Sequence, residues 1–500
     1  MVKNWIQRTP VIIGVGEVLD RPSNLQVSKE PLHLMADALR RADEDAGGGW
    51  LDRIESLDVV NSMTWGYTNL AAQLSQTLQI APKRAAYGAI GGNTPVSYIH
   101  QAAIQIGLGN VDVAAVCGAE ASQSLLRARK TNTLLRWTPD GPKPPAPRRD
   151  GILHPVVIRH GLTNPLAAYP LYEYASSASW GQSFEDWQME TAGLWSQLSS
   201  VAANNSYAWI RRVFEPSEIS TPSSDNRRVA GPYTKLMVAN PTVNQGAAIL
   251  LTSLGRAKAI GVPEERMVFV WGGSAASEPL DIATRDQYRH SSAMDAVLTA
   301  AKGLAQQQAE LDFVELYSCF PCIPKMARRV LEWPAEKDAT VTGGLTFFGG
   351  PYNNYMTHAA AAMTRRLREK TRGIGLLYGQ GGFVTQHHAL VLAMGPPIGP
   401  VDSSYDVQIN ADRFREDVPV LDEGFVGKTM VETYTILFDC RGEPESGVVF
   451  ARNAAGARVI ARVDAKGSDS FAFLTDPAQR VIGATGTTRQ GNDGLLRWDT

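Results

Sequence analysis

The sequence lacks several features that would place it in a broad functional class. No apolar run approaches the roughly 18 to 20 residues that a membrane helix requires, and the run at residues 11–15 is far too short. The 48 basic and 50 acidic side chains leave a formal net charge of −2, so no overall field attracts nucleic acid or an anionic membrane. These absences favour a small-molecule ligand and predict no membrane or nucleic-acid partner.

Cysteine is scarce as well. The four cysteines, at positions 117, 319, 322 and 440, cannot form a disulfide framework and fit a reducing compartment, so a cytoplasmic location is expected. Cys319 and Cys322 make one C-x-x-C pair, but no second pair stands at zinc-ligand spacing, and no metal site is predicted. The segment GVGEVL at residues 14–19 lacks the third glycine of a dinucleotide-binding turn, so no nicotinamide or flavin cofactor is expected.

The chain does contain a repeated alternation of helix and strand patterns. Apolar residues at helical spacing predict helices over residues 31–46, 293–308 and 354–369. The second and third of these lead into the buried-strand patterns DFVELY and GIGLLYG. This alternation predicts an α/β fold made of two similar halves, residues 1–257 and 258–397.

Two further regions differ from this pattern. Residues 121–240 or so are rich in Trp, Pro and Arg and include WTPDGPKPPAPRRD, which predicts an inserted loop domain. Residues 404–500 contain short alternating runs between Gly, Asp and Asn turns, which are typical of a small antiparallel β-barrel, of oligonucleotide/oligosaccharide-binding (OB) type. Few basic residues alternate with aromatics there, so the barrel gives little support for nucleic-acid binding.

Four glycine-containing segments stand where strands end. They are AIGGNTPVSYIHQAA, VELYSCFP, TGGLTFFGGPYNN and LLYGQGG. Open α/β folds bind ligands at such strand ends, and glycine lets a ligand approach the backbone closely. The alternative is that each glycine only serves a tight turn. Four such segments in one chain favour a ligand site.

In this order, the four segments resemble the thiolase superfamily, and more closely its sterol-carrier-protein-2-thiolase-like branch, over roughly residues 8–395. The C-terminal β region is most similar to the additional C-terminal domain of thiolase-like proteins type 1. The resemblance implies a duplicated five-layer α/β/α/β/α fold, recognition of acyl-CoA or coenzyme A, and a homodimer. Coenzyme A would enter as the carrier of the substrate rather than as a cofactor.

The resemblance also locates the family's catalytic positions in this chain. Counting back from Glu120 of GAE places the nucleophilic cysteine at Gly92, and the remaining motifs match VELYSCF, GGLTFFGGP and YGQGG. These positions carry none of the expected cysteine, histidine, acid or amide side chains: Gly92, Tyr317, Ser318, Gly350, Gly379 and Gly381. Acyl transfer through an acyl-enzyme needs a thiolate and a base, so the sequence argues against ordinary thiolase activity.

Three functions stay open on this evidence. The first is an acetyl-CoA acetyltransferase-like protein of lipid or sterol metabolism, in which the backbone N–H groups of Gly92 and Gly381 still hold a thioester oxygen. The second is a non-catalytic acyl-CoA-binding or scaffolding protein. The third is a retro-aldolase in which Tyr317 and Tyr378 converge on one pocket, provided that one phenol has a depressed pKa. The alternative for both tyrosines is that they fill space vacated by the lost catalytic side chains.

Coenzyme A also needs cations for its phosphates. The candidates are the basic residues at the start of the loop domain: Arg127, Arg129, Lys130, Arg148 and Arg149. The alternative is a solvated basic face. The remaining cysteines and histidines near the motifs are expected to be structural: Cys117, Cys319, His358, His387 and His388.

Overall fold

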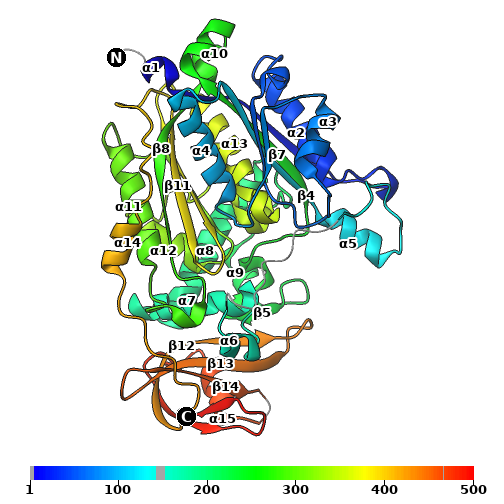
Figure 1. The fold of residues 1–500 in the computed structure, drawn as a ribbon. Helices are drawn as coiled ribbons and strands as arrows, with labels where there is room; N and C mark the ends of the chain where they lie inside the picture. The colour runs from blue at the N-terminus through cyan, green and yellow to red at the C-terminus, as the bar shows by residue number, and fades with distance from the viewer. Residues whose placement is uncertain (1–4, 142–152, 466) are drawn as a thin grey trace.

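The computed structural model describes residues 5–141, 153–465 and 467–500. A large body built on a nine-stranded sheet lies above a small β-barrel (Figure 1). Within these residues, no helix combines the length and the apolar character that crossing a bilayer requires. All four cysteines are free thiols.

The sheet of the body has the strand order β3-β2-β4-β7-β1-β8-β11-β10-β9. Its strands are β1 Pro10–Leu19, β2 Ser56–Val59, β3 Arg84–Tyr87, β4 Val113–Ala121, β7 Asn244–Ser253, β8 Val268–Ser277, β9 Phe313–Leu316, β10 Ile374–Gly381 and β11 Gln386–Ala393. A short antiparallel contact between β1 and β8 joins the two halves, with Val11 opposite Phe269. The expected boundary near residue 257 falls in α10 (Leu254–Ile260), between the two groups of strands.

Helices cover both outer faces of the halves and fill the space between them (Figure 1). The main helices are α2 Pro31–Asp45, α4 Thr94–Leu108, α11 Ser292–Gln306, α12 Cys322–Leu331 and α13 Tyr355–Arg368. Helices α4 and α13 contact each other and strands of both halves, whereas α2 packs on the first half and α11 on the second. The layers therefore follow the order α/β/α/β/α.

The predicted helices are confirmed to within a residue or two at each end. Helix α4 buries the apolar residues Val96, Ile99, Ala103 and Ile106, which lie at helical spacing along one face. Gly109 ends this helix in the left-handed conformation that favours glycine.

The inserted region is largely helical. Its helices are α5 Ser122–Lys130, α6 Pro155–Arg159, α7 Pro165–Ser179, α8 Phe184–Ala203 and α9 Pro216–Ser220. It also contributes strand β5 (Arg228–Gly231), which pairs with a strand of the barrel, and the short β6 (Tyr233–Thr234). The sequence did not predict this sheet between the loop region and the barrel.

The barrel closes on five strands in the order β12-β13-β14-β16-β15, with β12 paired to both β13 and β15. They are β12 Gly427–Phe438, β13 Pro444–Asn453, β14 Arg458–Asp464, β15 Thr485–Gln490 and β16 Leu496–Asp499, with α15 (Asp469–Thr475) between β14 and β15. The buried guanidinium of Arg458 donates to the Ala283 carbonyl at 2.8 Å and to the carboxylate of Glu432, and so ties the barrel to the body.

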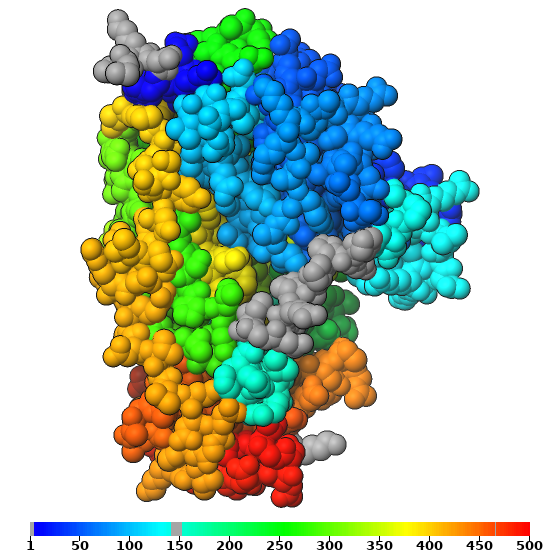
Figure 2. All heavy atoms as spheres, in the orientation of Figure 1, coloured from blue at the N-terminus to red at the C-terminus, as the bar shows by residue number. Residues whose placement is uncertain are grey.

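The segment before the barrel lies against the body. Helix α14 (Gln408–Phe414) packs on α11, and the Ala275 N–H donates to the Tyr405 carbonyl at 3.0 Å. In Figure 2, the orange-gold atoms of this segment run down one face from the body to the barrel. The barrel strands themselves begin only at residue 427.

Candidate functional site

Tyr317 fills the space beside Gly92. Gly92 lies in the turn before α4, and a Cβ atom built on it would be 2.6 Å from Tyr317 Cζ and 2.5 Å from the Gln380 carbonyl oxygen. Both distances are below 3.0 Å, closer than real Cβ atoms come to their neighbours. The position expected to hold a nucleophilic cysteine therefore cannot hold a side chain while Tyr317 keeps its place.

The two glycines of β10 join the same cluster. A Cβ atom on Gly379 would lie 3.0 Å from Asn93 Cα, and one on Gly381 would lie 2.6 Å from Asn93 Oδ1. The structure thus brings together Gly92, Tyr317, Gly379 and Gly381 around Asn93, at the N-terminus of α4. This cluster is called the central site below.

Ser318 and Gly350 lie beside a neighbouring loop. The Leu345 N–H donates to Ser318 Oγ at 3.2 Å, and the Gly350 N–H donates to the Asn240 carbonyl at 2.8 Å. A Cβ atom on Gly350 would meet its nearest neighbour, Ala239 Cβ, at 3.4 Å, an ordinary contact. Of the four motif glycines at positions 92, 350, 379 and 381, Gly350 alone has room for a side chain without displacing a neighbour.

Tyr378 does not share the pocket of Tyr317, contrary to the prediction. In the parallel pair β9–β10, Tyr378 stands opposite Leu316, so its side chain leaves the sheet on the face that Leu316 uses. Tyr317 is the next residue and leaves on the other face, toward Gly92. The Tyr378 hydroxyl instead bonds to His387 Nδ1 at 2.7 Å. The prediction was wrong because the sequence did not reveal the register of these strands.

The acidities of these groups also differ from those required for aldol chemistry. Burial raises the pKa of Tyr317 and of Tyr378 well above that of an ordinary phenol. Burial likewise raises the pKa of the Cys319 thiol to about 12, and its sulfur accepts a hydrogen bond from Gln380 Nε2 at 3.2 Å. The retro-aldol hypothesis required one phenol with a depressed pKa, and neither phenol has one.

The nearby histidines are held in structural contacts. His358 Nδ1 lies 2.6 Å from the buried carboxylate of Glu17, which also pairs with Arg365. Burial lowers the pKa of His358 to about 3 and that of His387 to about 4. His388 Nε2 bonds to His100 Nδ1 at 2.9 Å. None of these rings reaches the central site as a free base.

Two buried carboxylates fix the loops that surround the site. Glu120 accepts hydrogen bonds from the Met63 N–H at 2.6 Å and the Thr64 N–H at 2.9 Å, and burial raises its pKa to about 7. Glu315 accepts from the Tyr355 hydroxyl at 2.6 Å and the Val341 N–H at 2.8 Å, and burial raises its pKa to about 6. Each stands in a motif used for the resemblance, GAE or VEL, but only the structure shows this role.

Several polar groups of the central site have no partner within the described residues. They are the Gly92 N–H, Asn93 Oδ1 and Gln380 Oε1. Buried polar groups are normally paired with protein, water or ligand. The N–H group suits an oxygen such as a thioester carbonyl, and the two amide oxygens suit donors. The sequence did not indicate Asn93 and Gln380 as site residues, because the positions that match the motifs are the glycines beside them.

Three of the predicted cations, Arg127, Arg129 and Lys130, lie on α5, at the edge of the first half (Figure 1). The Arg127 guanidinium is already engaged, since it donates to the Pro22 carbonyl at 2.7 Å and to the Ser23 carbonyl at 3.4 Å. Arg129 and Lys130 are exposed. Arg148 and Arg149 lie outside the described residues.

Comparison with known proteins agrees with this architecture. Residues 407–493 match the family model of the "Thiolase-like protein type 1 additional C-terminal domain". The structure is similar to a monomeric SCP2-thiolase-like protein type 1 from Mycobacterium smegmatis, with 26% identity, 98% of this chain and 99% of that chain covered, and a TM-score of 0.82. A search of curated proteins finds no match.

More distant structures share the body of the fold. An Ltp2-ChsH2(DUF35) aldolase is 16% identical, with 77% of this chain and 98% of that chain covered and a TM-score of 0.56. Human mitochondrial 3-ketoacyl-CoA thiolase in complex with CoA is 13% identical, with 78% and 98% covered and a TM-score of 0.54. The predicted thiolase-type fold with a closed C-terminal barrel is confirmed.

Proposed function

Since the chain falls in the sterol-carrier-protein-2-thiolase-like branch of the thiolase superfamily, we propose that it binds acyl-CoA thioesters of lipid metabolism without performing thiolase chemistry. The observation that carries this proposal is the contact between Gly92 and Tyr317. A nucleophile at residue 92 has no space, and the phenol that takes the space is neutral because burial raises its pKa. This corresponds to the second of the three functions that the sequence left open.

The binding part of the proposal rests on the N-terminus of α4. Gly92 lies two residues before the first residue of the 15-residue helix α4, whose positive N-terminal end favours a carbonyl oxygen or an anion. The structurally similar human thiolase holds CoA. The exposed Arg129 and Lys130 are the described cations that we assign to the CoA phosphates.

Three further expectations belong to this proposal. We place the protein in the cytoplasm, supported by its four free cysteines. The parallel β14–β16 pair and the strand order of the barrel support an OB-type assignment.

The sequence predicted a homodimer, but the similar M. smegmatis protein is described as monomeric, and we propose a monomer here too. Sedimentation velocity of the purified chain tests the last point.

The test of binding uses an isosteric change at the central site. Asn93→Asp keeps the shape of the side chain that carries the unpaired oxygen but replaces its neutral amide by a carboxylate, which the N-terminus of α4 tolerates. Asn110→Asp, just past the C-terminal end of the same helix, is the matched control. Acetyl-CoA and longer acyl-CoAs are titrated calorimetrically into each protein, and the mixtures are analysed by mass spectrometry with and without free coenzyme A.

We expect wild type and Asn110→Asp to bind alike, and Asn93→Asp to bind about tenfold more weakly because its charge repels the thioester oxygen. The mass spectra should show intact acyl-CoA. Absence of binding to wild type would remove the proposal and leave the likeness as one of fold. Formation of ketoacyl-CoA or acetyl-CoA would overturn the part that denies thiolase chemistry.

A further inference from the structure

A cavity separate from the central site, called the second cavity below, lies between the inserted region and the barrel. It has a volume of about 540 Å³, and helices α7 and α8 and strand β5 form one side while β12 and the segment 474–482 form the other. Small-molecule sites favour such domain interfaces, and this volume is in the range that they occupy. No glycine of the central site lines the cavity. It is therefore a separate place from the proposed acyl-CoA site.

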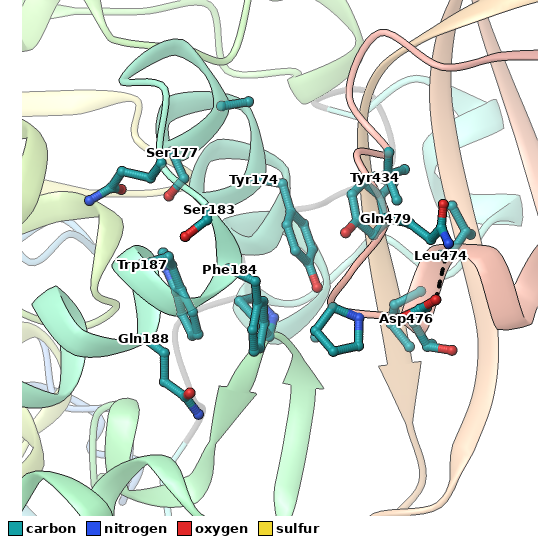
Figure 3. Close-up of a pocket in the computed structure, with 18 of the residues that line it drawn as sticks. Tyr174, Ser177, Ser183, Phe184, Trp187, Gln188, Tyr434, Leu474, Asp476 and Gln479 are labelled. Carbon is teal, nitrogen blue, oxygen red and sulfur yellow. Dashed lines mark hydrogen bonds between the residues drawn. The ribbon is translucent and has the colours of Figure 1, made fainter.

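Aromatic side chains form the walls of the cavity, and one aromatic pair connects the inserted region to the barrel. Tyr174 of α7 stacks on Tyr434 of β12, and their ring centroids lie 3.9 Å apart. The ring centroids of Phe184 and Trp187, both on α8, lie 5.4 Å apart. Figure 3 shows Tyr174 between the Phe184–Trp187 pair and the barrel side chains. Phe184 lines the cavity and keeps 39% of its surface exposed.

The α7–α8 end of the cavity holds polar groups without partners. Ser177 is 8% exposed, and within the described residues its hydroxyl oxygen has no hydrogen-bond partner. Gln182 uses its amide nitrogen on Glu190 at 2.7 Å, but its buried Oε1 is unpaired over the same residues. A hydroxyl donor and an amide acceptor at one end match a ligand hydroxyl, which both accepts and donates. Buried polar groups are normally paired with protein, water or ligand, so these two groups keep hydrogen-bonding capacity for a ligand.

The rim is positively charged. Arg228 and Arg480 line the cavity and are exposed, and neither forms an ion pair with a carboxylate of the described residues. Asp476 is also on the rim, but its carboxylate accepts from the Ala478 N–H at 2.9 Å and from Gln479 Nε2 at 3.1 Å. The rim thus has two guanidinium groups without an ion-pair partner among the described residues and one carboxylate that is already hydrogen-bonded, so it favours an anionic group on the ligand. A ligand carboxylate suits this place, because its two oxygens match the paired N–H donors of a guanidinium group.

We infer that this cavity binds an apolar carboxylic acid that carries a hydroxyl group far from its carboxylate. The carboxylate lies at Arg228 and Arg480, the apolar body lies against the aromatic walls, and the hydroxyl lies at Ser177 and Gln182. The ligand is a free acid, so the inference does not depend on the proposed binding of CoA thioesters.

The experiment compares three probes of equal chain length on the full chain: ω-hydroxydodecanoate, dodecanoate and 1-dodecanol. Binding is followed by quenching of tryptophan fluorescence, because Trp187 lines the cavity, and by calorimetry. The variants are Ser177→Ala and the double change Arg228→Gln with Arg480→Gln. Lys428→Gln, an exposed change on the same barrel away from the cavity, is the control, and thermal unfolding checks the fold of each protein.

The expected order of affinity in wild type and in Lys428→Gln is ω-hydroxydodecanoate, then dodecanoate, then dodecanol. The arginine variant should lose about tenfold in affinity for both acids and little for dodecanol. Ser177→Ala should remove the preference for the hydroxy acid only. Equal binding of the three probes, or acid affinities that survive loss of both arginines, would overturn the inference. So would a wild type that binds none of them.

An acyl-CoA present in excess separates the two sites. Independent sites leave the hydroxy-acid affinity unchanged. Competition between the two ligands would show that this cavity is the acyl site of the CoA ligand, and would overturn the assignment to free acids.

Discussion

Glu173 and Lys325 form an ion pair of 2.5 Å in which neither side chain is exposed. The carboxylate also accepts hydrogen bonds from Trp187 Nε1 at 2.7 Å and from the Tyr233 hydroxyl at 2.8 Å. The charges are thus fully enclosed, and the partners Trp187 and Tyr233 come from α8 and β6, two elements that also line the second cavity. Trp187 belongs to both, with its ring on the cavity and its nitrogen on the ion pair.

Replacing Lys325 by Met should destabilise the protein strongly. The change leaves the Glu173 carboxylate buried without its counter-charge, which costs about 3–5 kcal/mol. Lys83→Met breaks an exposed pair with Glu55, in which the lysine is 76% exposed, and should cost less than about 1 kcal/mol. Urea unfolding monitored by circular dichroism measures both. Similar losses in the two variants would contradict the role given to burial.

A cysteine at residue 92 should be tolerated only when Tyr317 is truncated. Gly92→Cys alone overpacks the central site and should cost about 1–3 kcal/mol. Tyr317→Ala alone should cost about 3–5 kcal/mol. The double variant should be more stable than the sum of these losses by about 1 kcal/mol or more, because the collision is gone. Tyr317→Phe removes the hydroxyl oxygen, which is the nearest atom, but keeps the Cζ atom that also collides, so it should give less relief than Ala. Equal coupling with Phe and Ala would be evidence against this packing.

The two phenols should respond differently to loss of their hydroxyls. Tyr378→Phe leaves His387 Nδ1 buried without its partner and should cost about 1–3 kcal/mol. Tyr317→Phe should change stability by about 0.5 kcal/mol or less, since its hydroxyl forms no hydrogen bond with a described residue. Denaturant unfolding of both variants measures this difference. Equal costs would mean that the two groups act in one network after all.

Acid should weaken the fold partly through His100. Burial lowers the pKa of this residue to about 4, so between pH 6.5 and 4 the unfolded chain binds a proton that the folded protein excludes. Stability is then lost as the pH falls, by about 1.6 kcal/mol between pH 6.5 and 5 from this residue. His100→Gln should lose about that much less than wild type when unfolding is measured at both values. Parallel losses in the two proteins would show that His100 does not carry the effect.

The sequence predicted the helices and halves well because their apolar stripes depend only on local spacing. The meeting of Gly92 with Tyr317 followed from motif order, since both stood at strand or helix ends of one expected site. Tyr378 was misplaced because one residue of strand register decides the face of a sheet. The second cavity could not be predicted, since Ser177 and Arg480 are brought together only by tertiary packing.

The pairing of β5 with β12 also bears on how the chain can be shortened. Opposite Ile436 and Leu437, the backbone of Gly231 and Ala230 finds its hydrogen bonds in the barrel. A chain cut near residue 403 would leave β5 with an unpaired edge, and such edges recruit strands from other molecules. The barrel therefore covers this strand edge, and we expect a truncated chain to self-associate even where its thiolase-like body is intact.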